Sequence, residues 1–518
     1  MGKQRAARAE VLAVDVGSTA TRGDLFDDAG TSVARRAKRE HRFRTGGDGT
    51  SVIDPDAVAD EVASVIDELC AQASSPIAGV ALDTFASSLV GVGADNAALT
   101  PCFTYADGRC APQLDALRAE LGTDGEAAAQ QRTGCRLHTS YLTARLRWLA
   151  ETAPEVVRKV HRWVSLGEYV HLRLLGAAAA GTSTAAWTGM LDRRTGGWDA
   201  QLLSLAGVGA DRFSPIADPD EPSRPAGAAP DRVATRWPLL ADARWFAVIT
   251  DGLASNLGAG AADGSTVALS AATSGAMRVL VTGIPDRLPP GLWCYRVDAR
   301  RCLVGGAVND VGRVTAWLDS TVVLDGHTLG EIAAAEPDPA TPVMLPFLTG
   351  ERSTGWASRA RAVLGGMTAA ATGPALARAG LEGVAITYRR IAEQLATVMG
   401  NPGPAGAGDP NSAGSVGEAG GASTGDGPAR IHASGRVLAE LPEFGGMLAD
   451  ALQTPVIPVT GKRVTLRGTA LLALDTLAPH TERAAPAMGP ARQPRPEHAA
   501  HYADVAARFQ ELYRSTVG

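Results

Sequence analysis

The stretch that decides the fold is Val11-Leu12-Ala13-Val14-Asp15-Val16-Gly17-Ser18-Thr19-Ala20-Thr21-Arg22. Residues 11–16 form an apolar run of strand-forming residues, Gly17-Ser18-Thr19 is a turn, and residues 21–26 return as a second strand. The pattern predicts a β-hairpin whose tip exposes backbone amides and hydroxyl groups. Such a tip can bind a phosphate group. The alternative is a plain hairpin turn without a ligand.

Asp15 lies at the end of the first strand of this hairpin, next to the turn. A carboxylate in that place can hold Mg²⁺ directly or through water, because magnesium prefers oxygen ligands and keeps several water molecules. If the turn binds phosphate, Asp15 is therefore the candidate metal ligand.

Strand and helix signals alternate after the hairpin. Asp54-Pro55 supplies an N-cap and a first-turn proline for a helix whose apolar residues recur at helical spacing up to Leu69. A longer helix is predicted over 377–399 and a final one over 499–513. This alternation predicts an α/β protein.

The length of 518 residues predicts two domains, because a single compact domain rarely exceeds about 250 residues. A connection rich in Pro, Ala and Asp covers residues 215–231, and a strand-like segment begins at Trp245. We therefore place the first domain at 1–235 and the second at 236–518. Residues 400–427 are rich in Gly, Ala, Ser and Pro, which predicts a disordered surface loop.

Composition excludes several classes of protein. Hydrophobic residues make up 45% of the chain, and the net charge of -6 gives no attraction to nucleic acid or to anionic membranes. No segment approaches the roughly 18 apolar residues of a membrane span, and the polar, basic N-terminus is not a secretory signal. The six cysteines lack a Cys-x-x-Cys pair, so we expect reduced thiols in the cytoplasm.

A second set of small, polar segments lies in the other half of the chain. Asp251 follows a strand and precedes a small-residue helix start, where a carboxylate can accept a hydroxyl proton or serve as an N-cap. Thr273-Ser274-Gly275 lies between two strands and is similar to the tip of the first hairpin. Gly435 and Gly468 allow the backbone to approach a flat ligand closely.

These segments and their order resemble those of the FGGY carbohydrate kinases, members of the actin and hexokinase superfamily, over nearly the whole chain. The resemblance rests on segments 15–22, Thr104-Tyr105-Ala106-Asp107-Gly108-Arg109, Trp187-Thr188-Gly189-Met190-Leu191-Asp192, Gly197-Trp198-Asp199, 251–260, Thr273-Ser274-Gly275, Gly305-Gly306-Ala307-Val308-Asn309, 346–352 with Trp356, 378–384, and Ala449-Asp450 with Arg467-Gly468. It implies an α/β protein of two actin-like (ribonuclease H-like) ATPase domains with a ligand cleft between them. The sugar would bind mainly to the first domain and the nucleotide to the second.

The resemblance also implies the reaction and the residues that carry it. ATP, with Mg²⁺, would phosphorylate a hydroxyl of a small sugar or sugar acid, with Asp251 as the general base and Asp15 facing the metal. By the same resemblance, the first phosphate loop would consist of Gly17, Ser18, Thr19, Thr21 and Arg22, and the second of Thr273, Ser274 and Gly275. Gly435 would face the adenosine. The sugar would be bound by Tyr105, Asp107 and Arg109.

The chain departs from the family pattern at three places. Ala272 stands where a glycine usually precedes Thr-Ser-Gly, and Arg436 stands where the adenosine loop usually has a second glycine. Ala86-Ser87 stands where related kinases usually carry a Met-His pair, which removes an imidazole and widens the pocket. We therefore expect Asp83 and Ser87 to contact the sugar.

The substrate is less defined than the fold. Segments 305–309 and 350–356 resemble gluconokinases more than glycerol kinases, so gluconate is the first candidate. The alternatives are a pentulokinase acting on xylulose or ribulose and a non-catalytic, actin-like protein that senses sugar. The expected partners are small molecules, with a homodimer allowed and no nucleic acid or membrane.

Several conspicuous side chains are expected to be structural. We expect Trp187, Trp198 and Trp356 to pack in the interior, and His138 and His432 to be ordinary surface or core residues. Glu351-Arg352 is either an internal ion pair or a substrate contact, and the sequence leaves both open.

Overall fold

The computed structural model describes residues 10–400 and 430–517. The loop expected at 400–427 therefore lies, except for Gly400, outside the described residues. Among the described helices, none is both long and apolar enough to cross a membrane. All six cysteines are free thiols.

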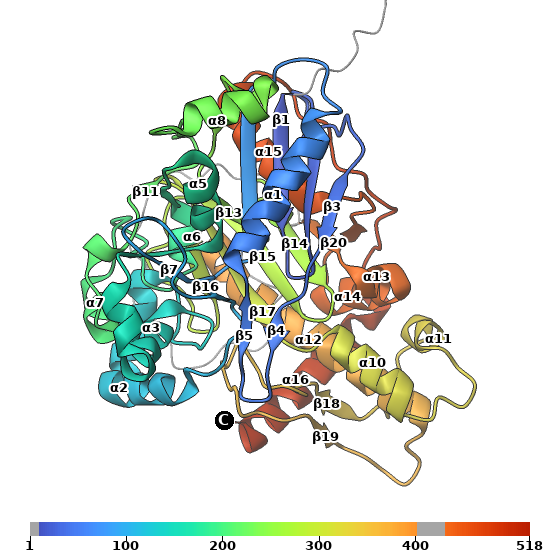
Figure 1. The fold of residues 1–518 in the computed structure, drawn as a ribbon. Coiled ribbons are helices and arrows are strands. Elements are labelled where there is room, and N and C mark those ends of the chain that lie inside the picture. Colours follow the sequence, from blue (N-terminus) through green and yellow to red (C-terminus); the bar gives the residue numbers. More distant parts are fainter. Residues whose placement is uncertain (1–9, 401–429, 518) are drawn as a thin grey trace, which may run out of the picture.

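The first sheet, to which β1, β3 and β13 in Figure 1 belong, has the strand order β12-β6-β1-β2-β3, and β13 also pairs with β6. β1 and β2 form the predicted antiparallel hairpin, whereas β1, β12 and β13 all run parallel to β6. The bounds of these strands are β1 (Val11–Val16), β2 (Ala20–Phe26), β3 (Ala37–Glu40), β6 (Gly79–Thr84), β12 (Arg244–Trp245) and β13 (Ile249–Thr250).

The second sheet has the order β16-β17-β15-β14-β20-β21. β14 and β15 form an antiparallel hairpin, and β20 and β21 continue the sheet in parallel beside β14. The orders β3-β2-β1-β6-β12 and β17-β15-β14-β20-β21 therefore follow one plan, which confirms the predicted pair of actin-like domains. The bounds are β14 (Thr266–Ala271), β15 (Gly275–Thr282), β16 (Trp293–Arg296), β17 (Arg301–Val308), β20 (Arg430–Ser434) and β21 (Val456–Pro458).

Helices cover both faces of the first sheet. Because neighbouring residues of a strand point to opposite faces, Leu12 and Val14 pack with α1, whereas Val11 and Ala13 pack with α15. The main helices are α1 (Pro55–Cys70), α2 (Ala111–Thr133), α3 (Leu142–Thr152), α5 (Leu166–Leu175), α9 (Asp251–Gly258), α10 (Gly312–Thr321), α12 (Gly373–Met399), α13 (Arg436–Glu440), α14 (Phe444–Leu452), α15 (Val464–Leu477) and α16 (Ala499–Thr516).

The chain passes from the first sheet to the second through α9. β12 and β13, which lie beyond residue 235, still belong to the first sheet. α15 returns from the second half of the chain and contacts α9, β1 and β6. The division at 235/236 stays a prediction from the sequence, and the first sheet itself is complete at Thr250.

The backbones of α9 and α15 lie in contact. A Cβ atom added at Gly258 would lie 1.7 Å from the carbonyl oxygen of Val464, and one added at Gly468 would lie 1.7 Å from that of Ala254. Both positions therefore require glycine. From the sequence, Gly468 was expected to approach a flat ligand, and the structure places a second helix there instead.

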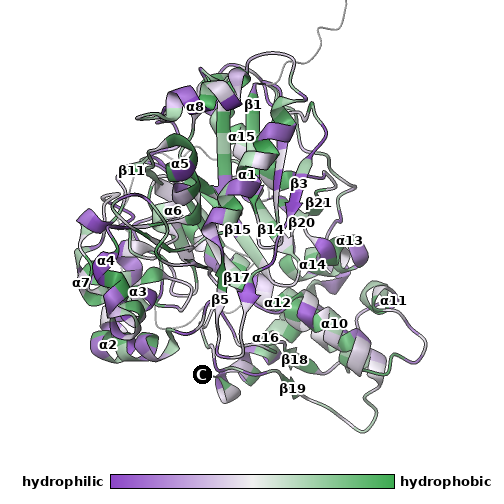
Figure 2. Ribbon diagram, in the orientation of Figure 1, coloured by the Kyte–Doolittle hydropathy of each residue, from purple (hydrophilic) through white to green (hydrophobic). Residues whose placement is uncertain are grey.

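The predicted long helix is confirmed as α12, which buries Leu381, Val384 and Ile391 in the core of the second domain. In Figure 2 the central strands of both domains carry hydrophobic residues, whereas outlying helices such as α2 show hydrophilic residues on their outer faces. The two hydrophobic cores are therefore centred on the two sheets.

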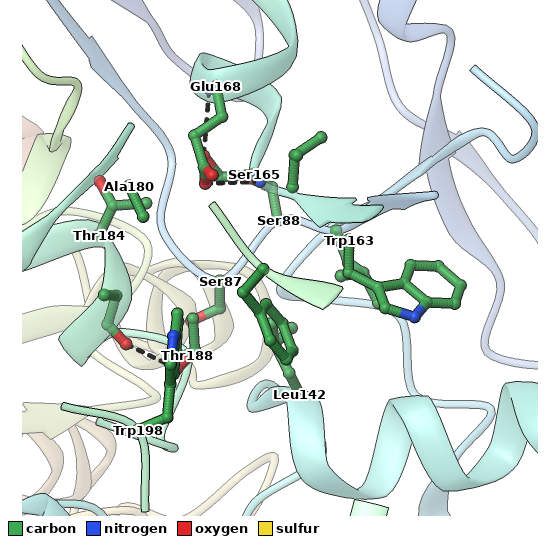
Figure 3. Close-up of a pocket in the computed structure, with 14 residues that line it drawn as sticks. Ser87, Ser88, Leu142, Trp163, Ser165, Glu168, Ala180, Thr184, Thr188 and Trp198 are labelled. Atoms are coloured by element: carbon green, nitrogen blue, oxygen red, sulfur yellow. Dashed lines mark hydrogen bonds between the residues drawn. The ribbon is translucent and has the colours of Figure 1, made fainter. Parts of the chain in front are cut away.

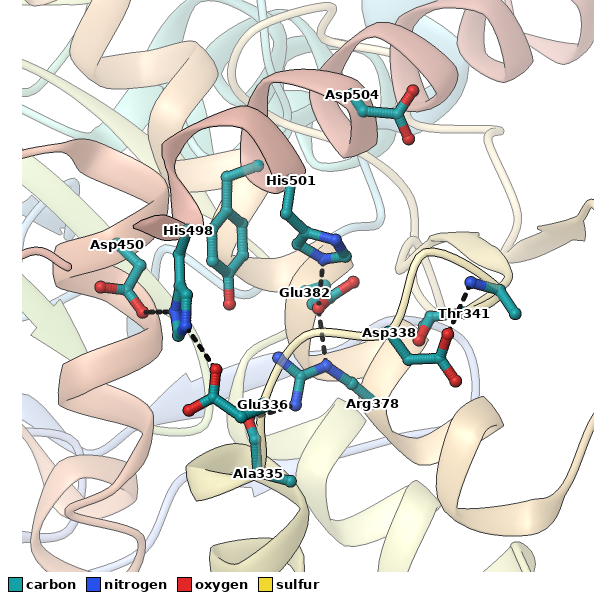
Figure 4. A network of polar contacts seen from close by, with 12 residues as sticks. Ala335, Glu336, Asp338, Thr341, Arg378, Glu382, Asp450, His498, His501 and Asp504 are labelled. Atoms are coloured by element: carbon teal, nitrogen blue, oxygen red, sulfur yellow. Dashed lines mark hydrogen bonds and ion pairs between the residues drawn. The ribbon is translucent and has the colours of Figure 1, made fainter. Parts of the chain in front are cut away.

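A polar network fastens α16 to the rest of the second domain (Figure 4). The Asp450 carboxylate on α14 is fully buried and accepts hydrogen bonds from the Arg495 amide and guanidinium at 2.7–3.0 Å. His498, next to the start of α16, contacts Asp450 through Nδ1 at 2.9 Å and the exposed Glu336 through Nε2 at 2.8 Å.

Replacing Asp450 with Ala is expected to lower the free energy of unfolding by about 3 to 5 kcal/mol, because Arg495 would lose its buried counter-ion and His498 a buried hydrogen-bond partner. Chemical denaturation measures this change. Glu336→Ala is the matched control, since it removes the exposed carboxylate of the same network and should cost less than about 1 kcal/mol. Equal losses in the two variants would contradict the assigned importance of Asp450.

Candidate active site

Three carboxylates gather where parallel strands of the first sheet end. Asp15 on β1 lies opposite Asp83 on β6, and Ile249 of β13 lies opposite Asp83 on the other side. Asp251 follows β13 directly and begins α9. In open α/β sheets, ligands bind at the carboxyl ends of parallel strands, so this edge is the candidate active site.

Asp251 is the first residue of α9, and the N-cap is Thr250. The structure therefore does not support the alternative that Asp251 is an N-cap. Burial, followed by the neighbouring charge of Asp15, raises the pKa of Asp251 to about 6. A carboxylate with a pKa near neutrality is well suited to accept a hydroxyl proton and release it again.

Asp15 lies between Asp83 and Arg22. Its Oδ2 is 3.6 Å from the Arg22 guanidinium. Burial raises the pKa of Asp15, and the contacts with Asp83 and Arg22 oppose that shift. Asp15 is therefore a partly screened carboxylate beside the tip of the first hairpin.

Asp83 and Ser87 lie inside the protein, and their expected contact with the sugar stays a prediction. Asp83 has no exposed surface, and Thr469 of α15 donates a hydrogen bond to its Oδ2 at 2.5 Å. Ser87 donates its hydroxyl to the carbonyl oxygen of Trp187 at 2.7 Å. It borders an internal cavity of about 20 Å³, shown in Figure 3, with room for about one water molecule rather than a sugar.

The tip of the first hairpin exposes Ser18 and Thr19, as a phosphate loop requires. The Gly17 amide donates to the Ala20 carbonyl at 3.1 Å and closes the turn. Thr21 differs from the expectation, because it is fully buried and its hydroxyl donates to Glu61 at 2.8 Å. A phosphate group can therefore reach the hairpin tip but not the Thr21 side chain.

The second hairpin exposes Thr273 and Ser274 in the same way. Ala272 is not among the described non-glycine residues with positive φ, so the missing family glycine causes no backbone strain. Gly275 is required for a different reason than phosphate binding. A Cβ atom there would lie 1.8 Å from the hydroxyl oxygen of Tyr388.

Gly435 lies at the end of β20, beside the second hairpin. Its φ is 116°, and a Cβ atom there would lie 2.2 Å from the carbonyl oxygen of Ala271. This position therefore requires glycine. The Arg436 side chain that follows is exposed and lies 3.8 Å from Glu440 on α13.

The predicted sugar-side residues fall into two groups. Tyr105 is 41% exposed, and burial, followed by the charge of Asp251, raises its pKa, so it lies near Asp251 at the seam between the domains. Asp107 and Arg109 instead bind each other, with Nη2 and Oδ2 2.6 Å apart, and Arg109 lies over the Trp148 ring at 4.5 Å. The ion pair holds the Arg109 side chain in place within the first domain, and the role of the two residues in sugar binding stays a prediction.

The seam between the domains is lined by aromatic rings. Trp187 stacks on Tyr295 with ring centroids 3.6 Å apart, and Trp198 packs against Phe213 at 4.6 Å. Trp356 donates its indole N–H to the Gly291 carbonyl at 3.2 Å. These contacts are the packing roles expected for the three tryptophans.

Two side chains that the sequence placed among ordinary residues lie in this seam. His138 accepts a hydrogen bond at Nδ1 from the Ser140 amide, and burial, followed by the Arg352 charge, lowers its pKa to about 3. His138 is therefore neutral at pH 7. Glu351 pairs with Arg390 at 2.9 Å, so the Glu351–Arg352 ion pair, one of the two alternatives that the sequence left open, does not form.

The donors at this edge fit Mg²⁺. Among the described residues, no group of three or more His, Cys, Asp or Glu side chains could hold a metal ion. Asp15 nevertheless offers a carboxylate beside an exposed, hydroxyl-rich turn. Such sparse protein coordination suits Mg²⁺, which is usually bound by one or two carboxylates together with water and substrate phosphates.

Comparison with known proteins identifies relatives over most of the chain. Two family models match: the N-terminal domain of the FGGY family of carbohydrate kinases over residues 10–258, and the C-terminal domain of that family over residues 267–476. The gluconokinase of Bacillus subtilis (strain 168) is 23% identical over 406 residues, covering 76% of this chain and 78% of that protein.

Solved structures agree on the fold. The gluconate kinase of Lactobacillus acidophilus matches with a TM-score of 0.85 at 24% identity, covering 98% of both chains. The ligand-bound xylulose kinase of Lactobacillus acidophilus matches with a TM-score of 0.84, also at 24% identity and 98% coverage of both chains.

Proposed function

Because the chain belongs to the FGGY family of carbohydrate kinases and is a phosphotransferase with an alcohol group as acceptor, we propose that its substrate is gluconate. ATP is the proposed phosphoryl donor. The similarity to the gluconokinase of Bacillus subtilis and the gluconate kinase of Lactobacillus acidophilus supports a sugar acid. A pentulose is the alternative, supported by the similarity to a xylulose kinase.

The observation that carries the proposal is the placement of Asp251. Its carboxylate lies at the end of β13, next to Asp15, and has a pKa raised to about 6. In the proposed reaction, Asp251 accepts the proton of the sugar hydroxyl as that oxygen attacks the γ-phosphorus of ATP. A protein that only senses sugar would not need such a base.

The remaining residues would bind and screen the phosphates. Ser18 and Thr19 on the first hairpin and Thr273 and Ser274 on the second are exposed and offer hydroxyl and amide donors. Asp15 would hold Mg²⁺, which neutralises phosphate charge when bound. We further propose a cytoplasmic location, in line with the six free thiols.

The test is ADP release by the purified protein with ATP and Mg²⁺, measured with gluconate, xylulose, ribulose and glycerol. We expect gluconate to give the highest kcat/KM. Highest activity with a pentulose would replace gluconate by the alternative substrate, and absence of ADP release with every sugar would favour the non-catalytic sensor.

The pH dependence of kcat/KM should follow the protonation of the Asp251 carboxylate. Its carboxylate must be unprotonated to accept a proton, so kcat/KM is expected to fall about tenfold per pH unit below about pH 6 and to level off above it. Initial rates from pH 5 to pH 9 at saturating Mg²⁺ measure this profile. A constant kcat/KM down to pH 5 would argue against Asp251 as the base.

A further inference from the structure

Two arginines in the seam between the domains lack a partner for their charge. The side chains of Arg278 and Arg352 each have a buried Nε without a hydrogen-bond partner. Other arginines with such a buried nitrogen, for example Arg145 and Arg378, bind carbonyl or carboxylate oxygens through their remaining nitrogens. For Arg278 and Arg352 the structure gives no side-chain hydrogen bond and no ion pair.

Arg278 lies on β15, in the middle of the second sheet, between Ala268 of β14 and Gly305 of β17. Its Nε would lie 3.9 Å from a Cβ atom added at Gly252, which places the guanidinium beside the first turn of α9. The same added Cβ atom at Gly252 would lie 3.1 Å from the Trp187 ring. Arg278 therefore points into the seam, next to Asp251.

Asp251 does not neutralise Arg278. Among the ion pairs within 4.0 Å in the described residues, none joins Arg278 to Asp251. The Arg278 charge lowers the pKa of Asp251, but burial and Asp15 outweigh it, and burial lowers the pKa of Arg278 itself. A guanidinium whose Nε is buried without a hydrogen-bond partner is costly, so the fold tolerates a charge that a ligand can offset.

Arg352 reaches the same seam from the loop after β18 (Val343–Leu345). Its guanidinium lies over the Trp356 ring at 5.8 Å. Burial raises the pKa of Tyr295, whose ring stacks on Trp187, and the charges of Arg352 and Arg278 oppose that shift. The two cations therefore act on one aromatic-lined space and come from separate segments of the second domain.

The position of Arg278 argues against a phosphate of ATP as its ligand. The tip of the second hairpin lies at Thr273 and Ser274, and β15 begins at Gly275. Arg278 is three residues farther along the strand, about 10 Å from that start at the usual rise of a β-strand. This separation favours an anion of the sugar over a phosphate group held at the tip of the second hairpin.

We propose that Arg278, assisted by Arg352, binds the carboxylate of an acidic sugar. Guanidinium groups bind carboxylates through charged hydrogen bonds with defined geometry. The hydroxyl to be phosphorylated lies at Asp251, and the carboxylate of the same molecule faces the arginines. This assignment rests on the proposed kinase function and specifies its substrate class as an aldonate.

Calorimetric titration of the full chain without ATP tests the carboxylate site separately from turnover. The ligands are D-gluconate and D-gluconamide, which has the same hydroxyl groups and a neutral amide in place of the carboxylate. We expect gluconate to bind about 10- to 100-fold more tightly, as one charged hydrogen-bonded contact provides. Equal affinity of the unmodified protein for the two ligands would overturn the proposal, whatever the variants do.

Variants test which residues cause the preference for gluconate over gluconamide. Arg278→Gln should weaken gluconate binding about tenfold or more and change gluconamide binding less than about threefold. Arg352→Gln should act in the same direction, and Arg278→Lys, which keeps the charge, should retain part of the preference. Arg301→Gln is the control, since Arg301 lies in the same sheet and is paired with Asp298 at 2.7 Å. If Arg278→Gln weakened both ligands equally, the carboxylate would not be its partner.

Parallel ADP-release measurements separate the two proposals. Arg278-dependent binding of gluconate without ADP release in the presence of ATP would support the carboxylate site and contradict the kinase function. ADP release with neutral sugars, and no preference for gluconate over gluconamide, would support the kinase function and overturn the carboxylate site.

Discussion

Replacing Asp251 with Asn is expected to lower kcat by about 10²- to 10⁴-fold while ATP affinity changes only a few-fold. The amide nearly matches the carboxylate in shape, but it cannot accept the proton of the sugar hydroxyl. Of the two neighbouring carboxylates, Asp83 is fully buried and accepts a hydrogen bond from Thr469, and Asp15 is the proposed metal ligand. Steady-state kinetics of ADP release, together with a separate ATP titration, measure both quantities.

The matched control is Asp263→Asn, which changes an exposed aspartate in the turn before β14, where it accepts a hydrogen bond from the Ser265 amide at 2.8 Å. This variant should keep normal kcat. Near-normal turnover of Asp251→Asn would remove Asp251 from the mechanism, and a parallel loss of ATP binding would indicate a damaged fold rather than a missing base.

Replacing Asp15 with Ala is expected to raise the Mg²⁺ concentration needed for half-maximal activity and to lower kcat by about 10²-fold or more, since it removes the carboxylate proposed to hold the metal. The same replacement should also lower the pKa of Asp251. The Asp15 charge helps to raise the pKa of Asp251, so the acid limb of the pH profile should move to lower pH.

Magnesium titrations at fixed ATP measure the first effect, and Asp60→Ala, which removes an exposed carboxylate on α1, is the control. An unchanged Mg²⁺ requirement in Asp15→Ala would contradict the metal assignment, even if kcat fell. An acid limb that stayed in place would contradict the electrostatic coupling of the two carboxylates.

The parts of the fold that local sequence determines could be predicted. The first hairpin follows from an apolar run, a small-residue turn and a returning strand, and α12 follows from a helical stripe that includes Leu381 and Ile391. The places of Asp15 and Asp251 could be predicted in the same way, because each follows a strand directly.

The side-chain partners that could not be predicted depend on contacts between segments that are distant in the sequence. Thr21 and Asp83 lie next to the active edge in sequence, yet Glu61 and Thr469 bind their side chains inside the protein. Such burial is set by α1 and α15, which pack on the sheet from both sides, and no local pattern encodes it. Asp107 and Arg109 likewise pair with each other.

Arg278 was missed for a related reason. A single arginine within an apolar strand, Met277 to Val281, is a weak signal, because such a side chain usually reaches the surface at a strand edge. Its significance comes from the unpaired guanidinium in the seam, which only the assembled sheet and α9 define. An arginine in the interior of a predicted central strand is nevertheless a signal that could have marked it.

The most direct test of the central claim is transfer of the labelled γ-phosphate of ATP to gluconate by the purified protein with Mg²⁺, with Asp251→Asn measured in parallel. The account predicts labelled phosphogluconate from the unmodified protein and none above background from the variant. Labelled inorganic phosphate as the only product of the unmodified protein, or an equal yield of labelled sugar from the variant, would contradict it.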